Sequence, residues 1–462
     1  MATLCDKVLP ALRGFFMGKW YPLLVTSLVI FGNLFEIEYY LNIVNVALVS
    51  IALLVCESIR PFIPFALTFA YQVTRDHSPG FPGFSDYYFS GARLVGVFIL
   101  VAVLVGSLVY FAIKNKIFVG LSHKTPLLLP LALLSLAFLT NGAFSTTWEW
   151  RDLLFGLTQV GSYALMFLIF FAGLAREDSE ELIDYIVTSA MLSAVALLTQ
   201  LAALYISGYP IVDGTIVKEN IHFGWGVMNS MGACLVALIP IALLGFHRSR
   251  HPIPYLVFGV VIYGAALLTL SRNAIIVGGV ILLASLITSS LVGERKRKII
   301  SRIALACGIL LVIAAVVVLW DKIEVVFRDL FERGLSDNGR FDLWKKGINY
   351  FLAAPVFGSG FFRPYNIEWI TAEFLPDMPH QTLITLLAAT GVFGALAYLW
   401  YRIETVRLIF RRVSAERLLM FLSVLALLLE SALDNFVFYY LSMILYNVIL
   451  AAVTVMNKKE SI

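Results

Sequence analysis

Charged residues are scarce in this sequence. Only 14% of its 462 residues are Asp, Glu, Lys or Arg, whereas 60% are hydrophobic and the mean hydropathy is +0.88. Soluble domains contain about 25% charged residues, and disordered chains lack the apolar residues that are abundant here. The scarcity of charge therefore excludes a soluble enzyme and a disordered protein.

Closely spaced cysteines and the common metal- and nucleotide-binding motifs are also lacking. Cys5, Cys56, Cys234 and Cys307 lie far apart, which excludes a disulfide scaffold and gives no metal-ligand spacing. The sequence contains no GxxxxGK phosphate loop, no HExxH and no Asp-x-Asp pair. Its net charge is only +4, which gives no support for nucleic-acid binding. We therefore expect no cofactor and no bound metal.

The hydrophobic residues fall in long runs separated by short polar clusters. A transmembrane helix needs about 20 apolar residues, and only structures that close their own backbone hydrogen bonds can cross lipid. The runs do not alternate apolar and polar residues, which excludes an outer-membrane β-barrel. We predict an all-α polytopic membrane helix bundle with 12–14 transmembrane helices. The predicted spans lie near residues 20–34, 38–56, 60–74, 92–113, 126–141, 152–175, 182–207, 223–246, 254–271, 273–292, 299–320, 380–402, 417–433 and 435–456.

The basic residues predict the orientation of these spans. With fourteen spans and a cytoplasmic N-terminus, most of the 34 Lys and Arg residues lie on the cytoplasmic side, including the clusters at 295–298 and 402–417. We therefore predict that both termini are cytoplasmic. The chain then divides into residues 1–320 with eleven spans, an extracytoplasmic loop at 321–379 with an amphipathic helix, and residues 380–462 with three spans.

Two polar residues lie at predicted outer ends of spans. Arg272 lies between two spans with almost no loop, where an arginine is costly unless it snorkels or pairs. Its simplest interpretation is an interfacial anchor. His380 lies where the long loop enters the next span, and its simplest interpretation is a polar helix end.

The long loop contains a third polar feature, in the stretch Gly-Arg-Phe-Asp-Leu-Trp-Lys-Lys that includes Arg340. Phe341, Trp344, Ile348 and Phe351 would form one apolar stripe if this stretch is helical. We expect an amphipathic helix, and one interpretation is that it simply rests on the bundle.

Together these residues favour a specific chemistry. Two arginines can bind phosphate oxygens in a forked geometry, and a neutral histidine can take a proton from a hydroxyl. Placed in a cavity that faces outward, Arg272, Arg340 and His380 suit a lipid pyrophosphate attacked by an alcohol. The arginines would stabilise the leaving group, so no metal would be required.

The ordered motifs of residues 268–397 resemble the O-antigen ligase and O-antigen polymerase superfamily of bacterial inner-membrane glycosyltransferases. The resemblance rests on LTLSRNA at 268–274, GRFDLWKKGINYF at 339–351, PVFGSG at 355–360 and HQTLITLLAATGVFG at 380–394. The order and spacing agree with the family pattern. Two departures are Asn273, where the family commonly has Gly, and Gln381, which offers the family's Asn amide one methylene further out.

The resemblance implies a reaction, its partners and its location. A glycan is transferred, without a metal, from undecaprenyl pyrophosphate to an acceptor sugar hydroxyl on the outer side of the inner membrane. The partners implied are the lipid-linked glycan donor, a glycan or lipid-linked acceptor, and membrane lipid. By motif position, Arg272 and Arg340 would hold the pyrophosphate, and His380 would act as a base or orient the acceptor.

Further residues are candidates for substrate binding. Arg363 follows PVFGSG and is a weaker candidate for a phosphate contact, and Trp344 is a candidate within the long loop. Asp434 and Glu430 lie near the outer end of the thirteenth span. They could orient His380, pair with an arginine or make ordinary polar contacts.

The identity of the acceptor leaves three interpretations open. A polymerase joins lipid-linked repeat units, and the fourteen predicted spans favour it. A ligase transfers the finished glycan to lipid A core, and it regains support if two of the short runs do not cross the membrane. A lipid-linked glycan transporter is the interpretation without chemistry. The gathering of polar residues at outer span ends, rather than at the midplane, favours an enzyme.

Overall fold

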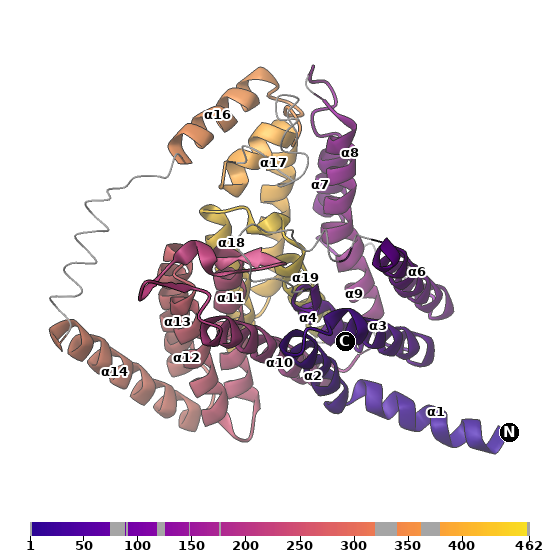
Figure 1. Ribbon diagram of the computed structural model, residues 1–462, viewed down its shortest axis with the longest axis vertical. Coiled ribbons are helices and arrows are strands. Elements are labelled where there is room, and N and C mark those ends of the chain that lie inside the picture. Colours follow the sequence, from indigo (N-terminus) through magenta and orange to yellow (C-terminus); the bar gives the residue numbers. More distant parts are fainter. Residues whose placement is uncertain are drawn as a thin grey trace.

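The structure, a computed structural model, describes residues 2–73, 88, 91–117, 125–146, 148–174, 177–318, 340–361 and 379–459 (Figure 1). Within these ranges the chain is almost entirely helical, which confirms the predicted all-α polytopic membrane bundle. The N-terminal helices are α1 (Ala2–Met17), α2 (Trp20–Leu34), α3 (Glu38–Val55), α4 (Phe62–Thr68), η1 (Ala70–Val73), α6 (Gly91–Lys114), α7 (Leu128–Leu139), α8 (Trp150–Val160), η2 (Gly161–Leu165), α9 (Met166–Leu174) and α10 (Ser179–Ile206).

Two short hairpins and the remaining helices follow. The hairpins pair β1 (Ile211–Val212) with β2 (Thr215–Ile216) and β3 (His222–Phe223) with β4 (Gly226–Val227), with η3 (Lys218–Asn220) between them. The later helices are α11 (Met228–Arg248), α12 (Pro252–Leu268), α13 (Arg272–Leu291), α14 (Arg295–Val318), α16 (Arg340–Ala353), α17 (Thr382–Ile409), α18 (Ala415–Ala432), η5 (Phe436–Phe438) and α19 (Tyr440–Lys459).

Each of the fourteen predicted spans contains helix, but the helices differ in length. Among the described residues, seven helices are long and apolar enough to cross a membrane, or eight if the bent pair Val8–Met17 and Trp20–Leu34 is one span. The helix α4 has only 7 residues and α7 only 12, whereas a span needs about 20. The number of 12–14 spans therefore stays a prediction.

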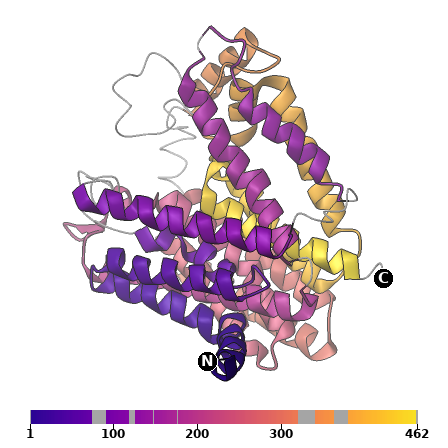
Figure 2. The same ribbon diagram turned by 90° about the vertical axis from the view of Figure 1, so that its right-hand side faces the viewer.

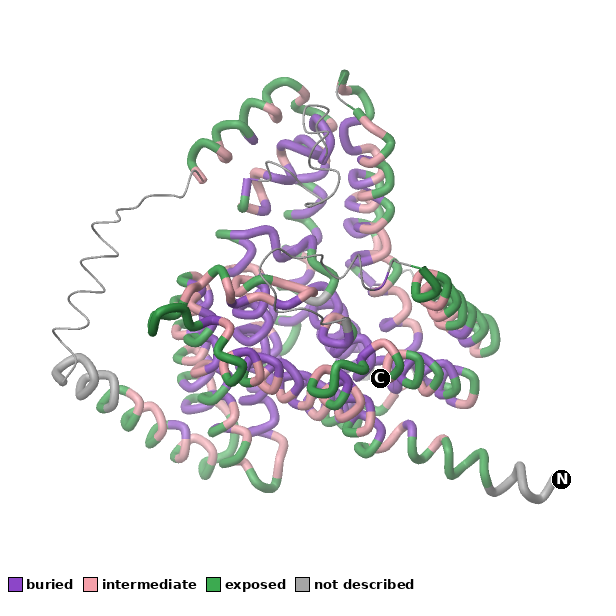
Figure 3. Tube along the Cα trace, viewed as in Figure 1, coloured by how far each residue is buried: buried purple, intermediate pink, exposed green. Residues whose placement is uncertain are grey.

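The core of the bundle is built around α11. Its membrane-spanning stretch is entirely buried, as Figure 3 shows for the centre of the bundle. It packs against α10, α12, α13 and α18. A helix that is apolar all round is stable when other helices or lipid surround it, and here neighbouring helices surround α11. The helices α2, α3 and α6 pack side by side at the periphery (Figure 2).

Buried arginines tie together one end of the bundle. The guanidinium of Arg248, at the end of α11, pairs with Asp184 of α10, with Glu180 at 2.8 Å and with Glu416 of α18 at 2.7 Å. Arg60, before α4, pairs in the same way with Glu177 and Glu181, close to the start of α10. The acidic residues at and just before the start of α10 are therefore the partners of arginines from neighbouring connections. We name this the Arg248 end.

The opposite end brings together the ends of α10, α12 and α18 and the starts of α11, α13 and α17. The hydroxyl of Tyr205 on α10 donates to the carbonyl of Leu268 on α12 at 2.5 Å. Side chains of α11 and of the segment before α17 both reach Asp434, which follows α18. We name this the His380 end, because it contains the candidate site.

The helix α17 is broken at Gly391, and the preceding loop repairs the break. Gly391 has φ 65° and ψ −164°, a conformation almost exclusive to glycine. The N–H of Val392 donates to the carbonyl of Pro355 at 2.8 Å, and the N–H of Ser359 donates to the carbonyl of Ala388 at 2.8 Å. The PVFGSG motif therefore supplies hydrogen-bond partners to the interrupted backbone, which lipid could not do. We call residues 355–360 the clasp.

Glycines let the clasp approach the helix this closely. A Cβ on Gly358, at φ +71°, would lie 2.2 Å from the backbone carbon of Ala389. A Cβ on Gly360, at φ +87°, would lie 2.6 Å from a carboxylate oxygen of Asp152. The glycines of this family motif thus have a structural role at the break in α17.

The position of Arg402 in the structure differs from the one expected from the sequence. It was expected to begin a cytoplasmic basic cluster, but α17 continues to Ile409 and Arg402 is buried within it. Its guanidinium lies 4.5 Å from the ring centroids of Tyr398 and Tyr446, and it donates to the hydroxyl of Tyr163 at 3.3 Å. Aromatic faces and a hydroxyl stabilise this buried cation where no water reaches it.

We predict that Gly391→Ala destabilises the protein, because alanine cannot adopt this backbone without strain and its Cβ would lie 2.3 Å from the carbonyl oxygen of Val356. The expected loss is about 1–3 kcal/mol. Thermal unfolding in detergent measures it. The matched control is Gly264→Ala in α12, where a Cβ meets nothing within 4 Å and should leave stability unchanged or slightly raised. Equal melting temperatures for the two variants would contradict the role of the break.

Candidate active site

Arg272 is placed by a tight turn between α12 and α13. Leu270 has φ +52°, which reverses the chain, and the hydroxyl of Ser271 caps α13 by accepting from the N–H of Ala274 at 3.5 Å. Gly232 of α11 makes room for the turn, since a Cβ there would lie 2.5 Å from the Cβ of Ala274. Arg272 is consequently the first residue of α13, with its side chain exposed at the His380 end.

Asn273 connects this turn to α18 through two hydrogen bonds. Its amide donates to the side chain of Glu430 at 2.5 Å and to the carbonyl of Glu430 at 3.2 Å. Glu430 is fully buried; one of its carboxyl oxygens accepts from Asn273, and the other has no hydrogen-bond partner among the described residues. Three contacts were considered for Glu430: with His380, with an arginine, or an ordinary polar contact. The structure shows an ordinary polar contact, the hydrogen bond from Asn273.

Arg340 is the first residue of α16, which lies across the start of α17. Gly347 is the buried contact, because a Cβ there would lie 2.7 Å from both Pro379 and Ile384. The helix itself agrees with the prediction, but the predicted stripe does not face the bundle. Phe341 is 60% exposed and Ile348 is 46% exposed. The small glycine, rather than the large apolar residues, makes the close contact.

Trp344 lies one turn after Arg340 and is half-buried. Its ring meets that of Phe341 edge to face, with 5.2 Å between the centroids. The indole Nε1 is buried and has no hydrogen-bond partner among the described residues. A buried donor without a partner is costly, so this N–H is a polar group that its surroundings in the described residues leave unsatisfied.

His380 and Asp434 form a hydrogen-bonded pair. The Nδ1 of His380 lies 3.2 Å from an oxygen of Asp434, and half of the histidine side chain is exposed. The same oxygen accepts from the N–H of Asn435 at 2.8 Å, and the other accepts from Asn229 of α11 at 3.4 Å. With Nδ1 donating to the carboxylate, Nε2 of the exposed ring is left as an acceptor.

The carboxyl of Asp434 is stabilised as an anion. Burial by itself would raise its pKa, but the hydrogen bond and charge of His380, the N–H of Asn435 and the charge of Arg340 lower it, and the net pKa lies below the ordinary value. Asp434 therefore remains ionised near neutral pH, as a residue that orients a histidine should. The influence of Arg340 also places α16 within electrostatic range of the His380–Asp434 pair.

A third cation joins the two arginines. Burial, the charge of Arg272 and the charge of Arg340 all lower the pKa of Lys218, in η3. Arg272 and Arg340 thus both act on the charge of Lys218, and Arg340 also acts on Asp434. Neither arginine makes an ion pair among the residues that the structure describes. This arrangement concentrates positive charge beside a potential proton acceptor.

Sequence reasoning identified most of this site but missed part of it. Arg272, Arg340, Trp344, His380 and Asp434 all lie at the His380 end. Arg363 lies outside the described residues, so its proposed phosphate contact stays a prediction. Lys218 and Asn229 were missed, because neither belongs to a motif, and only the fold brings them to the site. The described residues contain no group of three or more His, Cys, Asp or Glu that could hold a metal ion.

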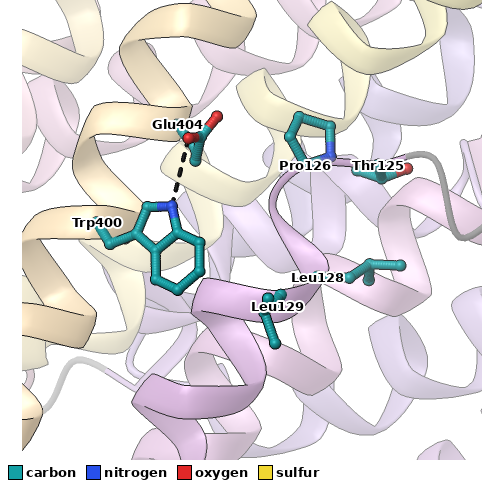
Figure 4. A pocket seen from close by; sticks show the side chains of 6 residues that line it. All are labelled: Thr125, Pro126, Leu128, Leu129, Trp400 and Glu404. Atoms are coloured by element: carbon teal, nitrogen blue, oxygen red, sulfur yellow. Dashed lines mark hydrogen bonds between the residues drawn. The ribbon is translucent and has the colours of Figure 1, made fainter.

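A cavity of about 520 Å³ lies elsewhere in the molecule (Figure 4). It is lined by Thr125, Pro126, Leu128, Leu129, Trp400 and Glu404. Its residues belong to the start of α7 and the later part of α17, remote from the start of α17 where His380 lies. Glu404 is engaged there by Trp400 at 3.3 Å and by Arg407 at 2.7 Å. We do not assign the cavity to the candidate site.

Comparison with known families agrees with the resemblance. Residues 256–399, less than a third of the chain, match the family model described as O-antigen ligase. The match includes Arg272, Arg340, Trp344 and His380, and it supports an O-antigen ligase-type membrane enzyme. It does not reach Lys218, Asn229, Glu430 or Asp434, which complete the site from other parts of the chain. No curated protein matches the sequence.

We predict that the contact between Glu430 and Asn273 stabilises the site. Glu430→Ala should lower the free energy of unfolding by about 1–3 kcal/mol, because it removes the hydrogen bond between the Asn273 amide and the carboxyl group and leaves only the bond to the main-chain carbonyl. Glu430→Gln keeps a carbonyl acceptor and should cost less. Thermal unfolding of both purified variants measures the difference. A Glu430→Ala protein as stable as Glu430→Gln would rule out this role for the contact.

Proposed function

We propose that this chain is a membrane glycosyltransferase that moves a glycan from undecaprenyl pyrophosphate to an acceptor sugar hydroxyl. The observation that carries the proposal is the gathering of Arg272, Arg340 and the His380–Asp434 pair at one end of the bundle. The match of residues 256–399 to the O-antigen ligase family supports the same reaction class.

The proposed step uses each group once. Nε2 of His380 accepts the proton of the acceptor hydroxyl as its oxygen attacks the anomeric carbon of the donor sugar. The bond between that carbon and the pyrophosphate oxygen breaks, and the electron pair leaves with the pyrophosphate. Arg272 and Arg340 stabilise the charge that develops on the leaving group. The carboxylate of Asp434 orients His380 and stabilises the imidazolium that forms.

In this proposal the arginines provide the positive charge, and no metal is required. Energy comes from cleavage of the activated lipid. Trp344 contributes its free indole N–H to a donor oxygen, and Arg363 remains a candidate for a further phosphate contact. The donor lipid, the acceptor and the surrounding membrane lipid are the partners.

We place the His380 end on the outer side of the bacterial inner membrane, with both termini in the cytoplasm. The support is the distribution of basic residues, most of which fall at or near the Arg248 end when connections alternate between sides. The loop predicted at 321–379 is then extracytoplasmic, and it contributes Arg340 and Trp344 to an active site that faces outward.

Two acceptors fit this chemistry. The fourteen spans predicted from the sequence favour polymerisation of O-antigen or capsule-like repeat units. The description of the matched family favours a ligase that transfers the glycan to lipid A core. A lipid-linked glycan transporter is the alternative from another class, and it gives no reason for a hydrogen-bonded His–Asp pair beside the cations.

We predict that His380→Ala abolishes transfer while the protein remains folded, because the proton of the acceptor hydroxyl then has no base. The measurement uses a deletion strain complemented with wild type or variant, with surface and lipid-linked glycans separated by size on a gel. The matched control is His251→Ala, an exposed histidine before α12 at the Arg248 end, which should restore normal glycans.

The gel also separates the candidate functions. Single repeat units attached to the anchor would identify a polymerase, and long chains retained on undecaprenyl pyrophosphate would identify a ligase. Normal glycans in both the deletion and the His380→Ala strain would contradict the proposed chemistry and favour transport.

We further predict that Asp434→Asn lowers kcat by about 100-fold or more while the donor KM changes little, because the amide no longer orients and charges the histidine correctly. Transfer measured with purified enzyme and synthetic lipid pyrophosphate tests this. The control is Asp213→Asn, at the exposed tip of the β1–β2 hairpin. Loss of donor affinity with an unchanged kcat would contradict the orienting role.

A further inference from the structure

The cavity between α7 and α17 lies at the Arg248 end of the bundle. The carbonyl of Ile409, the last residue of α17, accepts from Arg417 at 3.4 Å. Arg417 is adjacent to Glu416, which pairs with Arg248. The cavity therefore lies far along α17 from His380, and its volume of about 520 Å³ is within the range of ligand sites.

The cavity opens on a surface suited to lipid. Leu129 on α7, and Leu396 and Ile403 on α17, are all at least half exposed, and both helices are apolar parts of predicted spans. An exposed apolar surface on such helices is a surface for acyl chains. The two helices pack closely further along, where a Cβ on Gly394 would lie 3.3 Å from the Cβ of Ala137. The cavity is thus bounded by two packed helices and accessible from the membrane.

Polar groups with free hydrogen-bonding capacity line part of the cavity (Figure 4). Oε1 of Glu404 accepts from the indole of Trp400 at 3.3 Å and from the guanidinium of Arg407 at 2.7 Å. Oε2 accepts no hydrogen bond from the described residues, although only 12% of the side chain is exposed. The hydroxyl of Thr125, from the segment before α7, also has no partner among them. The cavity therefore offers two acceptors to a hydrogen-bond donor in apolar surroundings.

The charges beside the cavity match a zwitterion. The carboxylate of Glu404 favours a donor that carries positive charge, because charge-assisted hydrogen bonds are stronger than neutral ones. The guanidinium of Arg407 is mostly exposed beside it and suits a phosphate. A headgroup that contains both an ammonium and a phosphate satisfies both residues, whereas a purely anionic headgroup would be repelled by the carboxylate.

We propose that the cavity binds a phospholipid with a primary ammonium headgroup. The ammonium donates to Oε2 of Glu404 and to the hydroxyl of Thr125, and an acyl chain lies against Leu128 and Leu129. A trimethylated ammonium carries the same charge but has no N–H to donate. The site thus distinguishes the two headgroups by hydrogen bonds and not by charge. It is independent of the donor site proposed at the His380 end.

The test titrates the full-length chain in detergent with dioleoylphosphatidylethanolamine or dioleoylphosphatidylcholine and resolves each bound lipid by native mass spectrometry. The wild type should bind the ethanolamine lipid about tenfold more tightly, the size expected for one charged hydrogen bond. Glu404→Gln should remove most of this preference, because the amide is neutral, and Thr125→Val should reduce it by less. Leu129→Trp should weaken binding of both lipids, because the larger side chain fills the cavity.

The matched control is Glu294→Gln, which should keep the wild-type preference. Its carboxylate also pairs with an arginine three residues later, Arg297 at 3.5 Å, but does not line the cavity. Each preference is a ratio of two affinities within one variant, so partial unfolding, which lowers both affinities, cannot imitate its loss.

Three results would overturn the proposal. Equal affinities of the wild type for the two lipids, or an unchanged preference in Glu404→Gln, would exclude recognition of the ammonium. Wild-type binding by Leu129→Trp would place the lipid elsewhere. Tighter binding of dioleoylphosphatidylglycerol than of the ethanolamine lipid would show that an anionic headgroup occupies the cavity instead.

Discussion

Lipid offers no hydrogen-bond partners, and the rest of this structure depends on that constraint. Many polar groups of the described residues find a partner within the bundle or lie at one of its two ends. The break in α17 survives because the clasp completes its hydrogen bonds, and buried Arg402 survives among tyrosines. At the Arg248 end, arginines pair with carboxylates. At the His380 end, cations lie near the hydrogen-bonded pair of His380 and Asp434.

The His380 end is organised around Asp434. Its carboxylate receives His380 from the segment before α17, Asn229 from α11 and the N–H of Asn435 from its own turn. A single anion thus aligns three elements that are distant in sequence. Its hydrogen bonds go to these three groups, and neither Arg272 nor Arg340 makes an ion pair with it among the described residues. This arrangement is the basis for the proposal that the site binds a phosphorylated lipid.

Much of this organisation could be predicted from the sequence, since it follows from patterns that are local. Apolar runs gave the helical segments, and the motifs around Arg272, Arg340 and His380 gave the residues of the site. Contacts that depend on chain folding could not be predicted. Lys218 belongs to no motif, and its place beside Arg272 follows from the packing of α10, α11 and α12. The close contact of Gly347 on α16 with Pro379 and Ile384 could not be predicted, because periodicity identifies an apolar face but not the neighbour that covers it.

The clasp has a consequence for how this family segment can vary in evolution. It bonds to α17 on both sides of Gly391, and α16 rests on the start of α17 through Gly347. The separation between Arg340 and His380 is thus set by packing on a shared helix, not by the number of residues that join Phe361 to Pro379. Insertions and deletions in that joining segment leave the spacing of the site unchanged, whereas a single added residue inside the clasp would shift its register. We therefore expect homologues to differ in length between Phe361 and Pro379 and to keep the same length in the clasp.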